Sequence, residues 1–265
     1  MKNVFKAPAW LLMIATFFIP MAIIAIYSLL TRGGYGGIER PFTLENYTRL
    51  FDPLYGVIFA RSVWIAAVAT FLCLLLGFPL ALFIARSDRK NFWLALVILP
   101  FWTSFLIRLY AWMFLLRDTG LINTLFHTHL PMLYNNGAVI LGLVYGYLPF
   151  AVLPMYATLE RLDNTLLEAA ADLGATPLAA LYRVTIPLAM PGIRAAAILT
   201  FVPCIGTYLT SDLLGGSKTI LIGNLVQNQF TTARDWPFGA AASLVLMAVA
   251  LGLLFLAKRR GEELL

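Results

Sequence analysis

Charged side chains are scarce along this chain. Only 12% of its 265 residues are Asp, Glu, Lys or Arg, whereas 61% are hydrophobic and the mean hydropathy is +0.84. Soluble globular domains carry about twice this share of charge. The scarcity excludes an ordinary soluble protein, and the composition predicts an integral membrane protein.

The residues that usually build metal centres and disulfides are also few. The two cysteines, Cys73 and Cys204, lie inside apolar runs, which excludes a disulfide framework or a cysteine metal cluster. His127 and His129 have no Cys, Asp or Glu close to them in the sequence, so they do not form a usual zinc site. Without a catalytic Ser/His/Asp, paired-carboxylate or Cys/His arrangement, we predict no enzyme, no metal and no cofactor bound by this chain.

A nucleotide site is missing as well. The stretch Gly215-Gly216-Ser217-Lys218-Thr219 resembles the end of a phosphate-binding loop, but such a loop has glycine immediately before its lysine. Ser217 occupies that position. We therefore expect the energy for any active process to come from a partner or from an ion gradient.

Long apolar runs dominate what remains. A helix needs about 20 apolar residues to cross roughly 30 Å of hydrocarbon. The runs that meet this length are residues 9–30, 62–85, 92–116, 137–158, 192–213 and 236–257. Two of these runs contain a single charge near one end, Arg108 in 92–116 and Asp212 in 192–213. They predict an all-α membrane protein with six transmembrane helices, organised as a single domain over residues 1–265.

Lysine and arginine set the expected orientation. An even number of spans places both termini on one side, and Lys2, Lys6, Arg86, Lys90 and the basic cluster at 258–260 all fall on that side. By the positive-inside rule, both termini and the polar segment 160–190 are expected in the cytoplasm. The net charge of +6 therefore reflects topology and gives no reason to expect nucleic-acid binding.

The polar segment 160–190 is the main interruption of the apolar sequence. Thr165 and Glu168 have the spacing of a capping box at a helix start, and Gly174 suits a left-handed helix stop. Thr176 followed by Pro177 predicts a second start. We expect two short helices joined by a corner. The first should be about three turns long, with one apolar face formed by Leu162, Leu166, Ala170 and Leu173.

An ordinary capped loop helix would explain this local pattern, but the wider motif is more specific. Glu168-Ala169-Ala170, Gly174 and then Val184-Thr185-Ile186-Pro187 resemble the cytoplasmic "EAA" loop of ABC-importer permeases. Val184 and Ile186 stand where the family usually has Ile and Leu, so apolar bulk is kept. The resemblance implies the type I ABC importer permease fold and a coupling helix that docks into a cleft of an ATPase subunit.

The same resemblance implies residue roles and partners. It assigns ATPase coupling to Glu168, Ala169, Ala170, Asp172 and Gly174. It also implies a complex in the bacterial inner membrane, with a second homologous permease, a periplasmic binding protein and an ATPase dimer that holds ATP and Mg.

Several outer segments look like the polyamine branch of this family, the spermidine/putrescine importer permeases. These segments are 42–47, 100–103, 106–108, 211–216, 222–224 and 234–237. The resemblance covers nearly the whole chain and implies import of polyamines into the cytoplasm.

A polycationic substrate suggests which side chains line its route. Aromatic faces hold ammonium groups by cation–π contact, and Trp102, Phe105 and Leu109 are expected on one helical face. Arg108 and Asp212 both belong near the outer leaflet, where they could pair. We predict a substrate pathway formed by Trp102, Tyr110, Tyr208 and Asp212.

Two alternatives remain at this point. Within the family, the solute could be a phosphonate, sulfate or an amino acid. A gradient-driven secondary transporter is a different class, for which inverted repeats and broken helices around midplane charges are expected. Neither feature is evident in the sequence, and that class gives the EAA loop no role.

Overall fold

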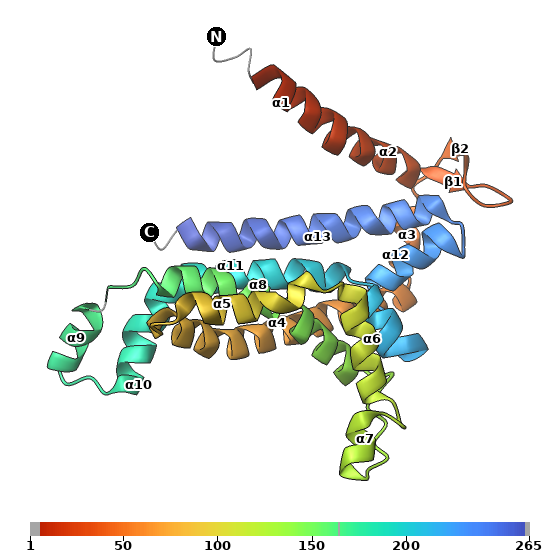
Figure 1. The fold of residues 1–265 in the computed structure, drawn as a ribbon. Helices are drawn as coiled ribbons and strands as arrows, with labels where there is room; N and C mark the ends of the chain where they lie inside the picture. Colours follow the sequence, from red (N-terminus) through yellow and green to blue (C-terminus); the bar gives the residue numbers. More distant parts are fainter. Residues whose placement is uncertain (1–5, 164, 263–265) are drawn as a thin grey trace. The chain divides into compact units, whose positions relative to one another are not determined.

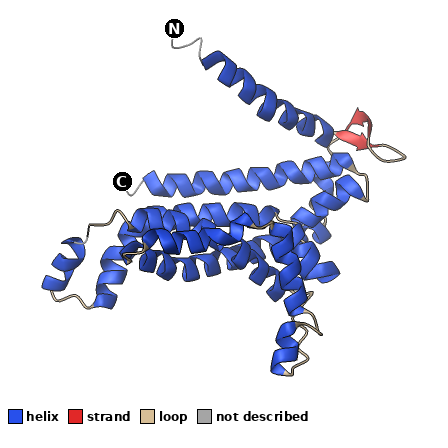
Figure 2. Ribbon diagram, in the orientation of Figure 1, coloured by secondary structure: helices blue, strands red, loops and turns tan. Residues whose placement is uncertain are grey.

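The computed structural model describes residues 6–163 and 165–262. Almost every described element is helical, and the sheet that it contains has two short strands (Figure 2). This confirms the all-α prediction. The chain divides into two compact units, Met1–Ala60 with Ile222–Leu253 and Arg61–Leu221 with Leu254–Leu265. Each is described by itself.

The first unit begins with one long apolar helical stretch, Trp10–Ser28, and continues into a small hairpin. In the hairpin Thr31 lies opposite Glu39 in antiparallel register. The elements of this unit (Figure 1) are α1 (Lys6–Met13), η1 (Ile14–Phe18), α2 (Ile19–Ser28), β1 (Leu30–Arg32), β2 (Ile38–Phe42), α3 (Glu45–Arg49), α12 (Ile222–Thr231) and α13 (Trp236–Glu262), whose last residues belong to the second unit.

An ion pair between the partly exposed Arg49 and the buried Asp235 joins α3 to the start of α13 within this unit. Arg49 Nη1 lies 2.9 Å from Oδ2 of Asp235, which is 2% exposed, and the Arg49 guanidinium carbon is 4.3 Å from the centroid of the Phe238 ring. Asp235 Oδ1 also accepts the Phe238 N–H at 3.2 Å, so it caps α13. Burial lowers the pKa of Arg49, but the hydrogen bond and attraction from Asp235 outweigh it, and the net shift is upward.

The second unit is a helical bundle. Its elements are α4 (Pro53–Arg86), α5 (Lys90–Ile98), η2 (Leu99–Trp102), α6 (Phe105–Leu116), α7 (Leu121–Phe126), α8 (Asn136–Leu159), α9 (Thr165–Asp172), α10 (Pro177–Ala180), η3 (Leu181–Thr185), α11 (Ile186–Gly206), η4 (Ser211–Gly215) and η5 (Gly216–Lys218). The first residues of α4 belong to the other unit.

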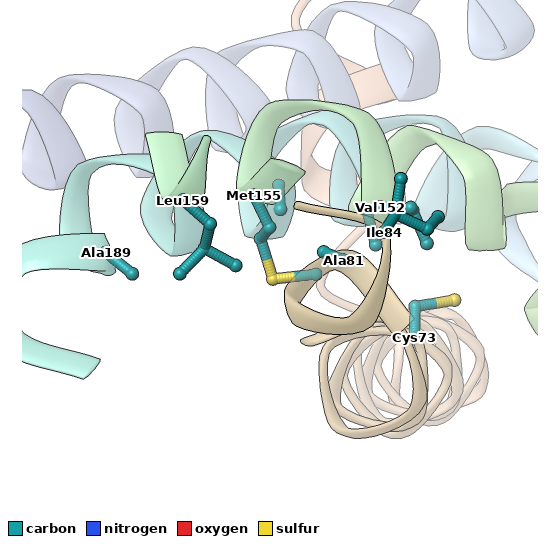
Figure 3. Close-up of a cluster of buried hydrophobic side chains, with 9 residues drawn as sticks. Cys73, Ala81, Ile84, Val152, Met155, Leu159 and Ala189 are labelled. Atoms are coloured by element: carbon teal, nitrogen blue, oxygen red, sulfur yellow. The ribbon is translucent and has the colours of Figure 1, made fainter. Parts of the chain in front are cut away.

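The core of the bundle lies where α4, α8 and α11 meet. Met155 extends from α8 toward α4 beside Ala81, as Figure 3 shows, and fills the space left by Gly77. The buried side chains of this cluster are Cys73, Ala81, Ile84, Ala151, Val152, Met155, Leu159, Ala189 and Ala196. Small residues dominate because close backbone approach stabilises helix contacts in lipid, where apolar burial contributes little.

Gly192 lies at a close approach of α11 to α8. A Cβ at this position would lie 2.8 Å from the carbonyl oxygen of Pro154 and would overlap the side chain of Thr158. We expect Gly192→Ala to lower the free energy of unfolding in detergent by about 1–3 kcal/mol, because overpacking forces backbone shifts. Gly252→Ala is the matched control, since a Cβ there meets nothing within 4 Å. Equal stability of the two variants would contradict this packing.

The expected spans are found in part. In the described residues, four helices are long and apolar enough to cross a membrane, or five if one bent pair is a single span. The four are Trp10–Ser28, Pro53–Arg86, Asn136–Leu159 and Pro177–Gly206. The apolar stretch Trp236–Gly252 is a shorter helix.

The prediction of one continuous helix over 92–116 is wrong. The axis turns by 88° between Lys90–Trp102 and Phe105–Phe126, and Thr103 has extended backbone angles (φ −97°, ψ 150°). Pro100 has no N–H for the helix ladder, so the chain tightens into the 3-10 turn η2 before it breaks. Trp102 and Phe105 consequently do not share one helical face.

The prediction for residues 192–213 also needs correction. The second short helix that was expected after Thr176 is the start of this span, because α10 continues through the π-turn η3 into α11. The span ends at Gly206, and Thr207 is extended (φ −69°, ψ 139°). Prolines 187 and 191 lie within this span, and membrane helices tolerate proline where neighbouring groups satisfy the freed backbone. Asp212 therefore lies beyond the helix end, in η4.

Candidate functional site

The corner between α9 and α10 is built as the sequence predicts. Gly174 has φ +80°, its N–H donates to Ala171 O at 2.8 Å, and the Ala175 N–H donates to Ala170 O at 3.0 Å. This pair of bonds is a Schellman motif, which closes a helix end with a left-handed residue. Thr176 then accepts the Ala179 N–H on its hydroxyl at 3.3 Å and caps the next helix.

The start of α9 differs from the prediction. The helix begins at Thr165 itself, and the Thr165 N–H donates to Asp163 Oδ1 at 3.0 Å, so Asp163 takes the role expected of the Thr165 capping box. This backbone hydrogen bond lowers the pKa of the Asp163 carboxyl. The helix has eight residues, about two turns where three were expected, because residues 160–162 still form turns at the end of α8.

The apolar side chains in and beside α9 differ in their exposure to solvent. Leu162 and Leu167 are half-buried against the bundle, whereas Leu166 is 46% exposed and Leu173 is 90% exposed. Of the four residues predicted to form one apolar face, Leu166 and Ala170 lie four positions apart in α9, whereas Leu162 precedes the helix and Leu173 follows it. With α9 and α10 projecting beyond the end of the bundle helices (Figure 1), Leu166 and Leu173 offer apolar surface to a partner.

A cavity of about 730 Å³ lies behind α9, between it and the turn that joins α4 to α5. Its charged lining residues come from both sides of this space. They are Arg86, Asp88, Lys90, Glu160 and Glu168. Glu168, in the first turn of α9, thus lines a mixed-charge cavity while it remains exposed to solvent.

An ion pair crosses the same region. Lys90 Nζ lies 3.3 Å from Glu160 Oε1, and both side chains are 39% exposed. A hydrogen bond from the Tyr156 hydroxyl, followed by the contact with Lys90, lowers the pKa of Glu160. A carboxylate with a lowered pKa keeps its interactions above its ordinary range and loses them as the pH falls, so the pair persists at neutral pH. Sequence reasoning missed this contact, since 70 residues separate its partners.

The other predicted coupling residues lie on or beside α9. Ala169 is exposed, Ala170 is half-buried, and Asp172 is exposed at the last position of the helix. Together with Glu168 and Gly174 they form one short, solvent-exposed unit, in which two alanines leave room for another surface to approach closely.

Of the four predicted pathway residues, one lines a cavity that the structure describes. Tyr208 lines a cavity of about 370 Å³ with Phe105, Tyr147 and Thr207, and the other three are not among its lining residues. Tyr208 O accepts the Asp212 N–H at 2.8 Å, so these two are neighbours. Trp102 is 83% exposed and Tyr110 is 46% exposed, on opposite sides of the bend between η2 and α6.

Arg108 and Asp212, whose pairing the sequence left open, do not pair. Asp212 is exposed, and Arg108 Nε and Nη1 are buried with no hydrogen-bond partner among the described residues. The Arg108 guanidinium carbon instead lies 5.0, 5.5 and 6.0 Å from the ring centroids of Phe101, Phe105 and Tyr145. The sequence indicates this arrangement through Phe101 and Phe105, which lie seven and three positions before Arg108.

Comparisons with known proteins agree with this geometry. Residues 77–259 match the family model described as binding-protein-dependent transport system inner membrane component. The spermidine/putrescine transport system permease protein PotB of Escherichia coli (strain K12) is 44% identical, with 97% of this chain and 95% of that protein covered.

Solved structures share the fold. A chain from the crystal structure of a bacterial ABC transporter involved in the import of the acidic polysaccharide alginate has a TM-score of 0.76 at 17% identity, covering 98% of this chain and 94% of that chain. A second alginate transporter structure, in complex with an alginate pentasaccharide-bound periplasmic protein, has a TM-score of 0.74 at 19% identity and covers 96% and 91%.

Proposed function

We propose that this chain, which belongs to the family of inner membrane components of binding-protein-dependent transport systems, is the permease subunit of an ATP-driven polyamine importer. Its substrates would be spermidine and putrescine, carried from periplasm to cytoplasm. The observation that carries the proposal is 44% identity, across nearly the full length of both chains, to a spermidine/putrescine permease. The Glu168–Gly174 corner stands at the EAA positions of the same sequence.

In this proposal the corner between α9 and α10 couples the chain to an ATPase dimer, which holds ATP and Mg and carries out hydrolysis. Glu168 contributes charge toward the cavity behind α9, Ala169 and Ala170 permit close approach, and Gly174 fixes the angle. Leu166 and Leu173 supply exposed apolar contact area. ATPase closure would move this corner relative to the bundle and change which side of the membrane the pathway faces.

The proposed function also implies a membrane topology for the chain. We propose six spans, counting the bent pair Lys90–Trp102 and Phe105–Phe126 as one and adding α13, whose 27 residues reach about 40 Å. Residues 1–265 would form one permease domain of the type I importer fold, with the 160–190 segment inside it. Both termini and this segment would face the cytoplasm of a bacterium, because basic residues favour that side.

Two further partners complete the proposed complex in the inner membrane. A second homologous permease would provide the other half of the pathway. A periplasmic polyamine-binding protein would deliver substrate. The alginate transporter solved with its periplasmic protein is the structural precedent, at the level of fold.

The test is uptake of labelled spermidine and putrescine into proteoliposomes that contain the whole complex and its binding protein. Import that requires ATP, and that unlabelled polyamines suppress while phosphonate, sulfate and amino acids do not, is the expected result. Suppression by one of those solutes would move the chain to another branch of the family. Import driven by an ion gradient without ATP would favour a secondary transporter.

The predicted pathway is tested by replacing its four residues together. Trp102→Leu, Tyr110→Leu, Tyr208→Leu and Asp212→Asn should lower uptake about tenfold or more, because aromatic faces and one carboxylate are removed from a polycation. An inside-negative potential of about 100 mV already favours entry of three charges by ~7 kcal/mol, so weak contacts suffice for passage. Trp64→Leu with Phe71→Leu, exposed on α4, is the control. Unchanged uptake at normal expression would remove this assignment.

A further inference from the structure

Arg108 is a buried cation without a charged or hydrogen-bonding counterpart at two of its nitrogens. The side chain is 9% exposed, and Nε and Nη1 have no hydrogen-bond partner within the described part of the chain. Its surroundings are the rings of Phe101, Phe105 and Tyr145. Cation–π attraction is weaker than a hydrogen-bonded ion pair at holding a buried charge. The guanidinium is therefore held loosely for a group at this depth.

The rings around Arg108 belong to a larger aromatic cluster that reaches a cavity. Phe101 contacts Phe150 at a centroid distance of 5.2 Å, and Phe105 contacts Tyr147 at 6.3 Å. Phe105 and Tyr147 both line the 370 Å³ cavity next to Tyr208. A cation in that cavity would share the Phe105 ring with Arg108.

Two neighbouring cations compete for cation–π contact with the same ring. An ammonium group beside Phe105 would lie near the buried Arg108 guanidinium, and like charges repel more strongly close to a buried group than in solvent. Either Arg108 or an ammonium group of the substrate can hold the aromatic faces, and the arrangement seen has Arg108 on them.

The three rings around Arg108 come from three different elements. Phe101 lies in η2, Phe105 in α6 and Tyr145 in α8, and the 88° bend separates the first from the second. Thr103 and Ser104, both extended, form the joint. A change in the bend angle would therefore move Phe101 away from Arg108 and open the enclosure, which gives the bundle a mechanical means of releasing the guanidinium.

We propose that Arg108 is a gate residue: its guanidinium occupies an aromatic site for ammonium groups and must leave before a polyamine enters. This inference rests on the proposed function, since it requires a cationic substrate. The proposal gives a reason for a permanent positive charge beside a route for cations. While Arg108 occupies the aromatic site, its charge keeps the substrate out of that site.

The test is equilibrium binding of labelled spermidine to the detergent-solubilised complex without its binding protein. Arg108→Met and Arg108→Gln remove the charge while keeping comparable length, and each should tighten binding about tenfold, or 1.4 kcal/mol. Arg108→Lys keeps a cation on the rings and should stay within about twofold of the wild type. The two neutral variants guard against the failure of either one to assemble.

Three outcomes would overturn the inference: all variants bind as the wild type does, all three weaken binding equally, or the lysine variant behaves like the neutral ones. The first would make Arg108 irrelevant to the site, and the other two would make its role structural. The wild-type complex is also assayed for ATP-dependent spermidine import with its binding protein present. Failure of that control would count against the proposed function itself, separately from Arg108.

Discussion

Replacing Gly174 with proline is expected to lower ATP-driven uptake about a hundredfold, with the subunit still inserted in the membrane. Proline fixes φ near −65°, whereas the corner has φ +80°, and proline also lacks the N–H that donates to Ala171 O. A loss of about 3 kcal/mol in the corner corresponds to a hundredfold change. Uptake and substrate-stimulated ATPase activity in the reconstituted complex are the measurements.

A graded series at this position separates backbone conformation from crowding. A Cβ on residue 174 would meet nothing within 4 Å, so the effect of Gly174→Ala comes from the left-handed φ alone, about 1–2 kcal/mol. Asparagine tolerates this conformation better than alanine. The expected order of uptake is Gly, then Asn, then Ala, then Pro. Alanine at wild-type activity, or proline without effect, would remove the corner from the coupling mechanism.

Reversing the charge of Glu168 should be the next most damaging change, with uptake reduced about tenfold or more. Lysine there would change the charged lining of the cavity from three carboxylates and two cations to two carboxylates and three cations. It would also place a cation in the first turn of a helix, where the backbone dipole favours negative charge. These two effects together are on the order of 1–2 kcal/mol. Uptake and stimulated ATPase activity should fall together.

The matched control for this change is Glu168→Gln, which keeps the shape and removes only the charge. We expect it to lose about threefold, because it introduces no repulsion. Complex assembly and binding of the substrate-loaded periplasmic protein are measured for both variants, since the proposed defect is in coupling. If lysine and glutamine variants lost activity equally, the shape of residue 168 would be the important property, and its charge would have no special role.

Local chemistry made the corner predictable. Gly174, Thr176 and Pro177 each have a conformational preference that only a few neighbours decide, and all three occupy the predicted positions. The start of α9 was harder, since Asp163 and Thr165 are both good caps and the outcome depends on where α8 stops. Because α8 ends in turns over residues 160–162, Leu162 lies before α9 and not within it.

Apolar length could not reveal how spans break or join. Residues 92–116 and 192–213 both have suitable composition, but the first bends at Thr103 and the second is displaced toward Pro177. Proline gives no clear signal in lipid, because it ends one helix near residue 100 and is accommodated at 187 and 191. Long-range contacts such as Lys90 with Glu160, and Arg108 with Tyr145, depend on packing that no local pattern encodes.

The ion pair between Arg49 and Asp235 has a consequence for the biogenesis of the chain. Its partners are 186 residues apart, so the ribosome has made most of the protein before Asp235 exists. Until then the Arg49 side chain lacks both its carboxylate and the Phe238 ring. A subunit truncated before residue 235 would therefore lack the contacts that join α3 to the start of α13. This part of the fold can therefore close only late in synthesis, after residue 235 of 265 has been made.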